Sequence, residues 1–362
     1  MNLREFYERV TEGMALKELW GQFKTEAESS YKLYSEDVDW ASLQKIPRWK
    51  RFFKVSWILF KAMLFHLTPA RRLLLLISLL LFIGGVGQVP NNRPTLAFWG
   101  GLGFLLLLAL ELADRVIMKR DLQIAREIQQ WLVPEAPPAL EGLDIAFATR
   151  PANTVGGDFY DVILEAGNGE EKKVLLVMAD VAGKSVPAAL LMATFQASLR
   201  ALVATNPSLE ELAVRLNKSV CERSLGGRRF TTAFLAEISL ETRLLHYINA
   251  GHNYPMLKRQ DGTLMKLSGG GLPFGIQSSS EYQIEAVQLE SSDFLLIFTD
   301  GVVEAVNRSG EEFEDGRLVS LVERAPHGSA EESLNVFRKA VDEFVGGARQ
   351  HDDMTWMVVQ VS

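Results

Sequence analysis

Apolar and polar positions follow two different patterns along the chain. From about residue 52 to residue 113 apolar side chains dominate, whereas from residue 143 onward short apolar runs alternate with polar turns. Long apolar runs are typical of helices that are buried or that cross a membrane. Short runs bounded by turn residues indicate the strands and amphipathic helices of a globular domain.

The apolar region contains two stretches without charge. Residues 73–89 carry none, and residues 95–110 are again uncharged, with Leu112 and Ala113 extending the second stretch past Glu111. Each approaches the roughly 20 residues that span a hydrocarbon core. The segment PNNRP at residues 90–94 predicts a polar turn between them. We therefore expect a transmembrane helical hairpin, because the alternative, a pair of buried core helices, would present a polar face to water.

Basic residues lie mainly outside the hairpin. The turn holds only Arg93. Lys50, Arg51, Lys54, Lys61, Arg71 and Arg72 precede the first stretch, and Arg115, Lys119 and Arg120 follow the second. The two stretches predict a multi-pass membrane protein, with the lipid bilayer as a partner. The positive-inside rule places both termini in the cytoplasm.

Helical patterns border the hairpin on both sides. Residues 52–67 are apolar but contain Lys54 and Lys61, which predicts an amphipathic helix in the membrane interface, with a third span as the alternative. Residues 114–132 have apolar positions at three- and four-residue steps, which predicts a helix that ends before Pro134. This helix either packs on its own domain or forms a homodimeric coiled coil. Residues 1–47 also look helical.

The expected organisation has four parts. Residues 1–72 form a cytoplasmic helical and interfacial segment, residues 73–113 two transmembrane helices, residues 114–138 a linker helix and residues 139–362 a globular domain. In that domain, helices are predicted at residues 187–204, 208–224, 317–325 and 330–344. Strands are predicted at residues 143–148, 159–164, 174–178, 232–239, 244–248, 255–258, 282–289, 294–298 and 355–361. Many strands with few, clustered helices indicate an α+β fold.

Composition narrows the chemistry. The formal net charge is −7, so no nucleic-acid-binding face is expected. Cys221 is the single cysteine, which excludes an intrachain disulfide, and the lack of a Cys/His cluster argues against a zinc site.

Aspartates stand at four predicted strand edges. Asp158 precedes a strand, Asp180 and Asp300 each end one, and the pair Asp352 and Asp353 precedes the last strand. A single Asp-Gly is usually only a turn, but four acidic edges suggest a carboxylate cluster that hard divalent cations neutralise. Oxygen ligands without His or Cys favour Mg²⁺ or Mn²⁺. Two such ions can hold a phosphoryl oxygen and activate water, which predicts phosphate-ester hydrolysis.

The motifs around these acids resemble one family. They are LQIAREIQ at residues 122–129, LVP at 132–134, VGGDFYD at 155–161, ADVAGK at 179–184, FTTA at 230–233, NAGHN at 249–253, GLPFG at 271–275, TDGVVEA at 299–305 and DDMT at 352–355. In this order they resemble the PPM, or PP2C-type, phosphatase superfamily, in particular bacterial RsbU- and SpoIIE-like serine/threonine phosphatases. The resemblance covers about residues 121–362. It implies a PP2C-like αββα sandwich, with two antiparallel sheets flanked by helices.

The resemblance also implies a site with two Mn²⁺ or Mg²⁺ ions. By motif, Asp180 would bridge both ions, and the carbonyl oxygen of Val181 would bind one of them. Asp300 and Asp352 would complete the shell of the first ion.

The remaining candidate residues have less definite roles. Asp158 would act directly or through water, and Asp353 is either a ligand or a supporting residue. Lys184 either meets phosphate or is simply solvated beside the glycine turn. For His252, a cap of the turn at residues 249–255 is favoured over a role as general acid.

Three positions depart from the family pattern. Ser185 stands where relatives often have glycine, and Asn153 and Thr154 stand where many have an arginine before the glycine pair. Ala182 replaces a histidine that animal-type PP2C enzymes use as a candidate general acid. The source of the phosphate contact and of the proton for the leaving group is therefore open.

The resemblance implies a metal-dependent phosphoserine or phosphothreonine phosphatase in a bacterial signalling pathway. The apolar hairpin, which lies outside the resemblance, places it in the bacterial inner membrane. A phosphorylated anti-sigma-factor antagonist of the STAS type is the expected substrate. The alternative is a degenerate domain that binds a partner without turnover, although such a module has no reason to keep clustered charge. A diguanylate cyclase is a remote third reading, because FYD follows the Gly-Gly-Asp at residues 156–158 and no nucleotide-binding pattern accompanies it.

Overall fold

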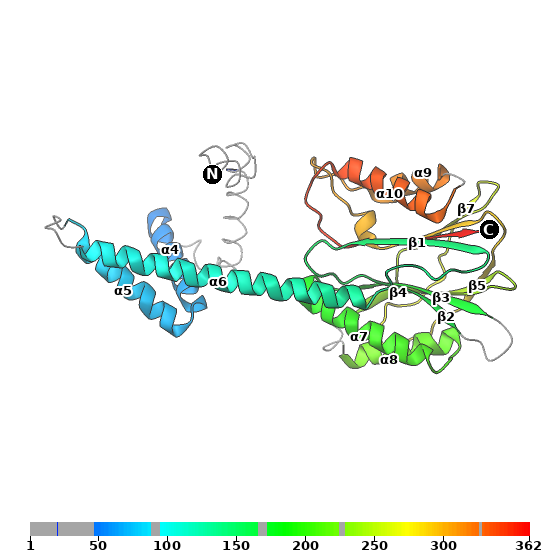
Figure 1. Ribbon diagram of the computed structural model, residues 1–362, viewed down its shortest axis with the longest axis horizontal. Helices are drawn as coiled ribbons and strands as arrows, with labels where there is room; N and C mark the ends of the chain where they lie inside the picture. The colour runs from blue at the N-terminus through cyan, green and yellow to red at the C-terminus, as the bar shows by residue number, and fades with distance from the viewer. Residues whose placement is uncertain (1–19, 21–46, 88–94, 166–171, 224–228, 326–327) are drawn as a thin grey trace. The chain divides into compact units, whose positions relative to one another are not determined.

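The computed structural model describes residue 20 and residues 47–87, 95–165, 172–223, 229–325 and 328–362 (Figure 1). The chain divides into two compact units, residues 1–117 and residues 118–362, which are described separately. The helix expected over residues 1–47 lies outside the described residues, apart from Trp20 and Pro47.

The N-terminal unit consists of helices. They are α4 (Arg48–His66), α5 (Pro69–Gly85) and α6 (Leu96–Trp131), the last of which continues into the second unit. The expected boundary between membrane span and linker at residues 113 and 114 is therefore not a break in the helix. No proline or glycine interrupts residues 104–131, so backbone hydrogen bonding continues through the change in polarity.

Small residues let α5 and α6 pack closely. A Cβ atom at Gly100 would lie 2.5 Å from the backbone nitrogen of Phe82, and one at Gly103 would lie 2.0 Å from Ser78 Oγ. Ser78 is accordingly buried between the helices. Beyond this contact, Arg71 of α5 pairs with Glu111 of α6 at 3.0 Å.

Large apolar side chains cover the outer surface of this helix pair. Examples are Leu73, Ile77, Leu80, Ile83, Phe98, Leu105 and Leu108, all exposed. By length and composition, two described helices could cross a membrane, α6 and α7 (Ser185–Val203). However, α7 buries Ala188, Met192, Phe195 and Leu199 in the second unit, as a core helix does. Helix α5 has 17 residues, or roughly 26 Å at 1.5 Å per residue, against ~30 Å of hydrocarbon.

The C-terminal unit contains two antiparallel five-stranded sheets. One has the order β1-β10-β9-β6-β7 and the other β2-β3-β4-β5-β8. The first comprises β1 (Leu143–Arg150), β10 (Met354–Val361), β9 (Phe294–Phe298), β6 (Met256–Lys258) and β7 (Leu264–Lys266). The second comprises β2 (Phe159–Glu165), β3 (Lys173–Val181), β4 (Thr231–Ser239), β5 (Leu244–Ala250) and β8 (Glu285–Gln288). Helices α9 (Glu314–Glu323) and α10 (Ala330–Val345) flank the first sheet, and α7 and α8 (Leu209–Arg223) flank the second (Figure 1).

Three apolar clusters hold these layers together. Residues such as Met178, Phe234 and Met357 fill the space between the two sheets. Trp356 and Phe337 belong to the cluster between the first sheet and its helices. A third cluster joins α7 and α8 to the second sheet. The central strands, such as β3, β4 and β9, are therefore buried on both faces. The predicted αββα sandwich is confirmed.

A few elements differ from the sequence predictions. The three-residue strand β7 was not expected, because it is too short to show a period. Strand β8 covers Glu285–Gln288, whereas residues 282–289 were predicted. Tyr282 instead packs in the core beneath α7 and α8. The short 3₁₀ helix η1 (Asp300–Val302) follows β9, where only a turn was expected.

Candidate active site

Strand register brings the acidic strand edges together. In the second sheet Phe159 lies opposite Ala179, so Asp158 and Asp180 flank the same end of the β2–β3 pair. In the first sheet Trp356 lies opposite Phe298, so the end of β9 and the start of β10 also coincide. Asp300 follows β9, and Asp352 with Asp353 precedes β10.

Glycines allow these edges to approach within contact distance. A Cβ atom at Gly157 would lie 2.9 Å from Val181 O and 3.6 Å from Asp180 Oδ1. One at Gly156 would lie 2.4 Å from Asp353 Oδ2, in the loop that leads into β10 of the other sheet. No side chain fits at these positions, so the glycine pair is required for the close approach of the two sheets.

Two threonine hydroxyls hold Asp158. Thr299 Oγ1 donates to Asp158 Oδ2 at 2.8 Å, and Thr355 Oγ1 donates to the same oxygen at 2.6 Å. Burial raises the pKa of Asp158 well above its usual value, and the charge of Asp180 adds to this, while the two hydroxyls oppose it. The charged form of Asp158 is therefore disfavoured by burial, and the two hydroxyl donors or a nearby positive charge stabilise it.

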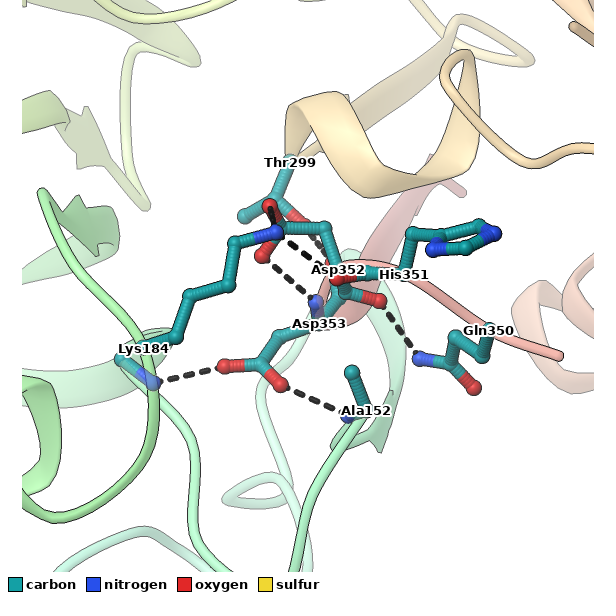
Figure 2. A network of polar contacts seen from close by, with 8 residues as sticks. Ala152, Lys184, Thr299, Gln350, His351, Asp352 and Asp353 are labelled. Atoms are coloured by element: carbon teal, nitrogen blue, oxygen red, sulfur yellow. Dashed lines mark hydrogen bonds and ion pairs between the residues drawn. The ribbon is translucent and has the colours of Figure 1, made fainter. Parts of the chain in front are cut away.

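Asp353 fastens the loop that precedes Asp158. Its Oδ1 accepts from the backbone N–H of Ala152 at 2.7 Å, and its Oδ2 accepts from that of Gly157 at 2.6 Å (Figure 2). Both oxygens are thus used within the chain. Of the two roles expected for Asp353, this geometry favours the supporting one.

Asp180 lies at the centre of the acidic cluster. Its pKa is raised to about 7, first by burial and then by the charges of Asp300, Asp352, Asp353 and Glu304. Burial followed by the charge of Asp352 also raises the pKa of Asp300. Burial and then the charge of Asp300 raise the pKa of Glu304. These carboxyl groups are close enough that each ionised one disfavours ionisation of the others. A bound cation would offset this repulsion.

Asp352 forms an ion pair with Lys184. Lys184 Nζ lies 2.9 Å from Asp352 Oδ2, and it also donates to the carbonyl oxygen of His351 at 2.8 Å (Figure 2). Asp352 Oδ1 accepts from the backbone N–H of Asp353 at 3.0 Å. The structure therefore places Lys184 in an ion pair at the edge of the acidic cluster, rather than simply in solvent.

The donor set fits hard divalent ions in kind. The half-buried carboxylates of Asp180, Asp300 and Asp352 and the adjacent carbonyl oxygen of Val181 are the oxygen ligands that Mg²⁺ and Mn²⁺ prefer. Within the part of the chain that the structure describes, no three acidic, histidine or cysteine side chains already converge so that they could hold an ion. The candidate ligands would therefore complete a coordination shell by side-chain rotation. Their assignment as ligands stays a prediction.

Several supporting residues were not predicted. Thr299, Thr355 and Glu304 border the acids, and a signal existed for the two threonines, which are hydroxyl residues directly beside acidic strand edges. Gln129, near the end of α6, was not singled out either. Its Nε2 donates to Gly156 O at 2.7 Å, and its Oε1 accepts from Gly156 N at 3.1 Å.

His252 lies behind the cluster and not in it. Its ring Nδ1 is 2.9 Å from Thr232 Oγ1, and Thr232 lies opposite Asp180 in the β3–β4 register. Burial lowers the pKa of His252 to about 4, so the ring is neutral at physiological pH and is not a poised proton donor. Its backbone is tied to Asn249 by two hydrogen bonds, so the asparagine side chain closes this turn.

Comparisons with known proteins identify the family. Residues 170–362 match the family model of stage II sporulation protein E (SpoIIE), which is more than half of the chain. The phosphoserine phosphatase RsbU of Bacillus subtilis is 29% identical over 245 residues, which cover 67% of this chain and 70% of that protein.

Solved structures show the same fold. The SiaA-PP2C domain of Pseudomonas aeruginosa superposes with a TM-score of 0.62 at 20% identity, covering 69% of this chain and 99% of that one. The PP2C phosphatase domain of SpoIIE from Bacillus subtilis, with a fragment of its regulatory domain, gives a TM-score of 0.53 at 19% identity, covering 62% and 64%. The chain therefore belongs to the SpoIIE family, and its C-terminal unit has the PP2C-type phosphatase fold.

Proposed function

We propose that this protein is a divalent-metal-dependent phosphatase that hydrolyses phosphoserine or phosphothreonine on a protein substrate in a bacterial signalling pathway. Its class, a protein serine/threonine phosphatase, follows from the SpoIIE family and the PP2C-type fold. The observation that carries the proposal is the acidic cluster, in which burial and mutual repulsion raise the pKa of Asp180 to about 7. Clustered buried carboxylates destabilise the fold unless bound cations neutralise them.

Asp180, the Val181 carbonyl, Asp300 and Asp352 are the residues we assign to two Mn²⁺ or Mg²⁺ ions. When bound, such ions polarise phosphoryl oxygens and lower the pKa of water. Asp180 stands between the other acids, which supports a bridging role for it. Asp158 is held by Thr299 and Thr355, so its carboxylate keeps one orientation and is available directly or through a water molecule.

The reaction itself requires one bond exchange. A water oxygen bonds to phosphorus, the bond between phosphorus and the seryl or threonyl oxygen breaks, and a proton passes to that leaving oxygen. His252 is not the donor, because burial lowers its pKa to about 4 and leaves the ring neutral near pH 7. With Ala182 at the position of the animal-type histidine, we assign the proton for the leaving group to water.

A phosphorylated regulatory protein of the STAS type is the substrate we propose. The support is the similarity to RsbU, which is named a phosphoserine phosphatase and of which the match covers 70%.

We also propose that α5 and α6 anchor the protein as a hairpin in the bacterial inner membrane. Exposed apolar side chains on both helices support this, because such a surface is unfavourable in water. The basic residues outside the hairpin favour both termini and the catalytic domain in the cytoplasm. Extraction at high pH and protease protection of tagged termini test this topology. A protein that washes off the membrane would contradict it.

The end of α6 is the proposed route from the anchor to the site. Gln129 makes two hydrogen bonds to Gly156, which is two residues from Asp158. A shift or rotation of this helix, alone or in a homodimer through the linker, would move the glycine loop. Whether the linker dimerises is read directly from the mass of the purified protein by light scattering.

The decisive experiment compares the full-length chain with two variants. Wild type, Asp180→Asn and Asp315→Asn are assayed on p-nitrophenyl phosphate and on a phosphorylated STAS protein, with Mn²⁺ or with EDTA. Asp315 is an exposed acid paired with Lys266, outside the acidic cluster, and serves as the matched control. We expect Mn²⁺-dependent turnover that Asp180→Asn abolishes and Asp315→Asn preserves. Equal activity of all three proteins contradicts the proposal, and retained partner binding without turnover favours a binding module.

A further inference from the structure

Lys184 connects α7 to the acidic cluster. It is the N-cap residue of α7, directly after the turn that follows Asp180. Its ammonium is 2.9 Å from Asp352 Oδ2 and 2.8 Å from His351 O, while 57% of its side chain remains exposed to solvent. Among the ion pairs of the described residues, this is the one that brings a lysine or arginine to the acidic cluster.

The backbone of the turn fixes where this side chain starts. Gly183 has φ +130° and Ser185 has φ +61°, both in the left-handed region, whereas Lys184 between them is extended at φ −134° and ψ 156°. This alternation directs Lys184 toward the start of β10 (Figure 2). Burial raises the pKa of Asp300 and Glu304, and the Lys184 charge opposes this rise, so the ammonium lies within electrostatic reach of both acids.

A phosphate ester that approaches this site meets unfavourable charge. Six carboxyl groups gather here, those of Asp158, Asp180, Asp300, Glu304, Asp352 and Asp353. A phosphoserine carries about −1.5 to −2 charges. The arginine that many relatives place before the glycine pair is absent, since Asn153 and Thr154 stand there. A cation that is already at the cluster and still mobile would offset this repulsion.

We propose that Lys184 binds the substrate phosphoryl group, exchanging Asp352 for phosphate when Asp352 takes up a divalent ion. This rests on the proposed function. An exposed ion pair between a lysine and a carboxylate is weak and exchanges readily. A four-carbon side chain that is more than half exposed has the freedom to turn from Asp352 to a ligand beside it. Lys184 thus has two positions, one as counter-ion of Asp352 and one as phosphate ligand.

Two titrations that need no turnover test this proposal. Mn²⁺ binding and then binding of inorganic phosphate to the Mn²⁺-loaded full-length protein are measured by calorimetry. The proteins are wild type, Lys184→Met, Lys184→Arg and the control Lys266→Met, which removes a lysine paired with Asp315 at the same distance of 2.9 Å. We expect Lys184→Met to bind Mn²⁺ at least as tightly as wild type, because its competitor for Asp352 is gone. Phosphate binding should weaken about tenfold or more, as for one lost charge-assisted contact. Lys184→Arg should retain part of the phosphate affinity, and Lys266→Met should retain all of it.

Unchanged phosphate binding in Lys184→Met would overturn the proposal. So would a loss of Mn²⁺ binding in that variant, since Lys184 would then support the ligands instead of competing with an ion. Kinetics on p-nitrophenyl phosphate give an independent reading, with KM expected to rise about tenfold in Lys184→Met. A wild type that binds Mn²⁺ and phosphate but hydrolyses nothing refutes the proposed function, while the two titrations still decide the role of Lys184.

Discussion

Replacing Asp180 by asparagine tests whether the fold keeps the acidic cluster at the expense of stability. The pKa of Asp180 is about 7 in the folded chain, against about 3.9 for an unfolded aspartate. Because the folded state binds the proton more tightly, the stability associated with Asp180 is fully present below the unfolded pKa and is lost as the pH rises through about 7. At 1.36 kcal/mol for each pKa unit, the loss is roughly 1–2 kcal/mol at pH 5 and roughly 4 kcal/mol at pH 8.

Asparagine has nearly the same shape and cannot ionise, so Asp180→Asn should escape this loss. We expect the EDTA-treated variant to exceed wild type in free energy of unfolding by up to roughly 4 kcal/mol at pH 8, and by up to roughly 1–2 kcal/mol at pH 5. These are upper values, because Asp300 and Glu304 share the same repulsion.

Urea unfolding followed by circular dichroism, at pH 5 and pH 8 with EDTA, measures both differences. Asp315→Asn, an exposed control, should match wild type at both values. The reasoning is refuted if Asp180→Asn is no more stable than wild type at pH 8, or if its advantage does not shrink on going to pH 5.

Three further substitutions probe the parts around the cluster. Gln129→Ala removes two hydrogen bonds to the glycine loop. It should lower the free energy of unfolding by about 1–2 kcal/mol and weaken Mn²⁺ binding measured by calorimetry. Gln123 is exposed on the same helix, so Gln123→Ala should change neither quantity. Ser185 has φ +61°, so Ser185→Gly should be at least as stable as wild type in thermal melts, while Ser185→Val should lose about 1 kcal/mol or more. Gly157→Ala places a Cβ atom 2.9 Å from a main-chain carbonyl oxygen. It should lower the free energy of unfolding by about 1–3 kcal/mol and reduce phosphatase activity. A fully active variant would contradict the close packing at Gly157.

The spacing of apolar residues was sufficient to predict most strands and helices of the C-terminal unit, because these elements are long enough to show a strand or helix period. Strand β3 and helices α7 and α10 begin and end within three residues of their predicted bounds. Short or irregular elements escaped. Strand β7 has three residues, and η1 depends on the packing of Gly301 against Asp353, where a Cβ atom would lie 2.0 Å from the carbonyl oxygen. A contact with a residue 52 positions away leaves no local signal.

The sequence by itself determined the elements of this protein: two charge-free apolar stretches, the alternating strands and helices of an α+β domain, and aspartates at strand edges. Local spacing is enough for these because each depends on neighbours along the chain. The tertiary structure alone decided how the acids are used. Strand register puts Asp158 beside Asp180, Thr299 and Thr355 hold Asp158, and Asp353 turns inward to the backbone of the glycine loop. The partners of Asp353 lie about 200 positions away in the sequence, and only the folded chain brings them together.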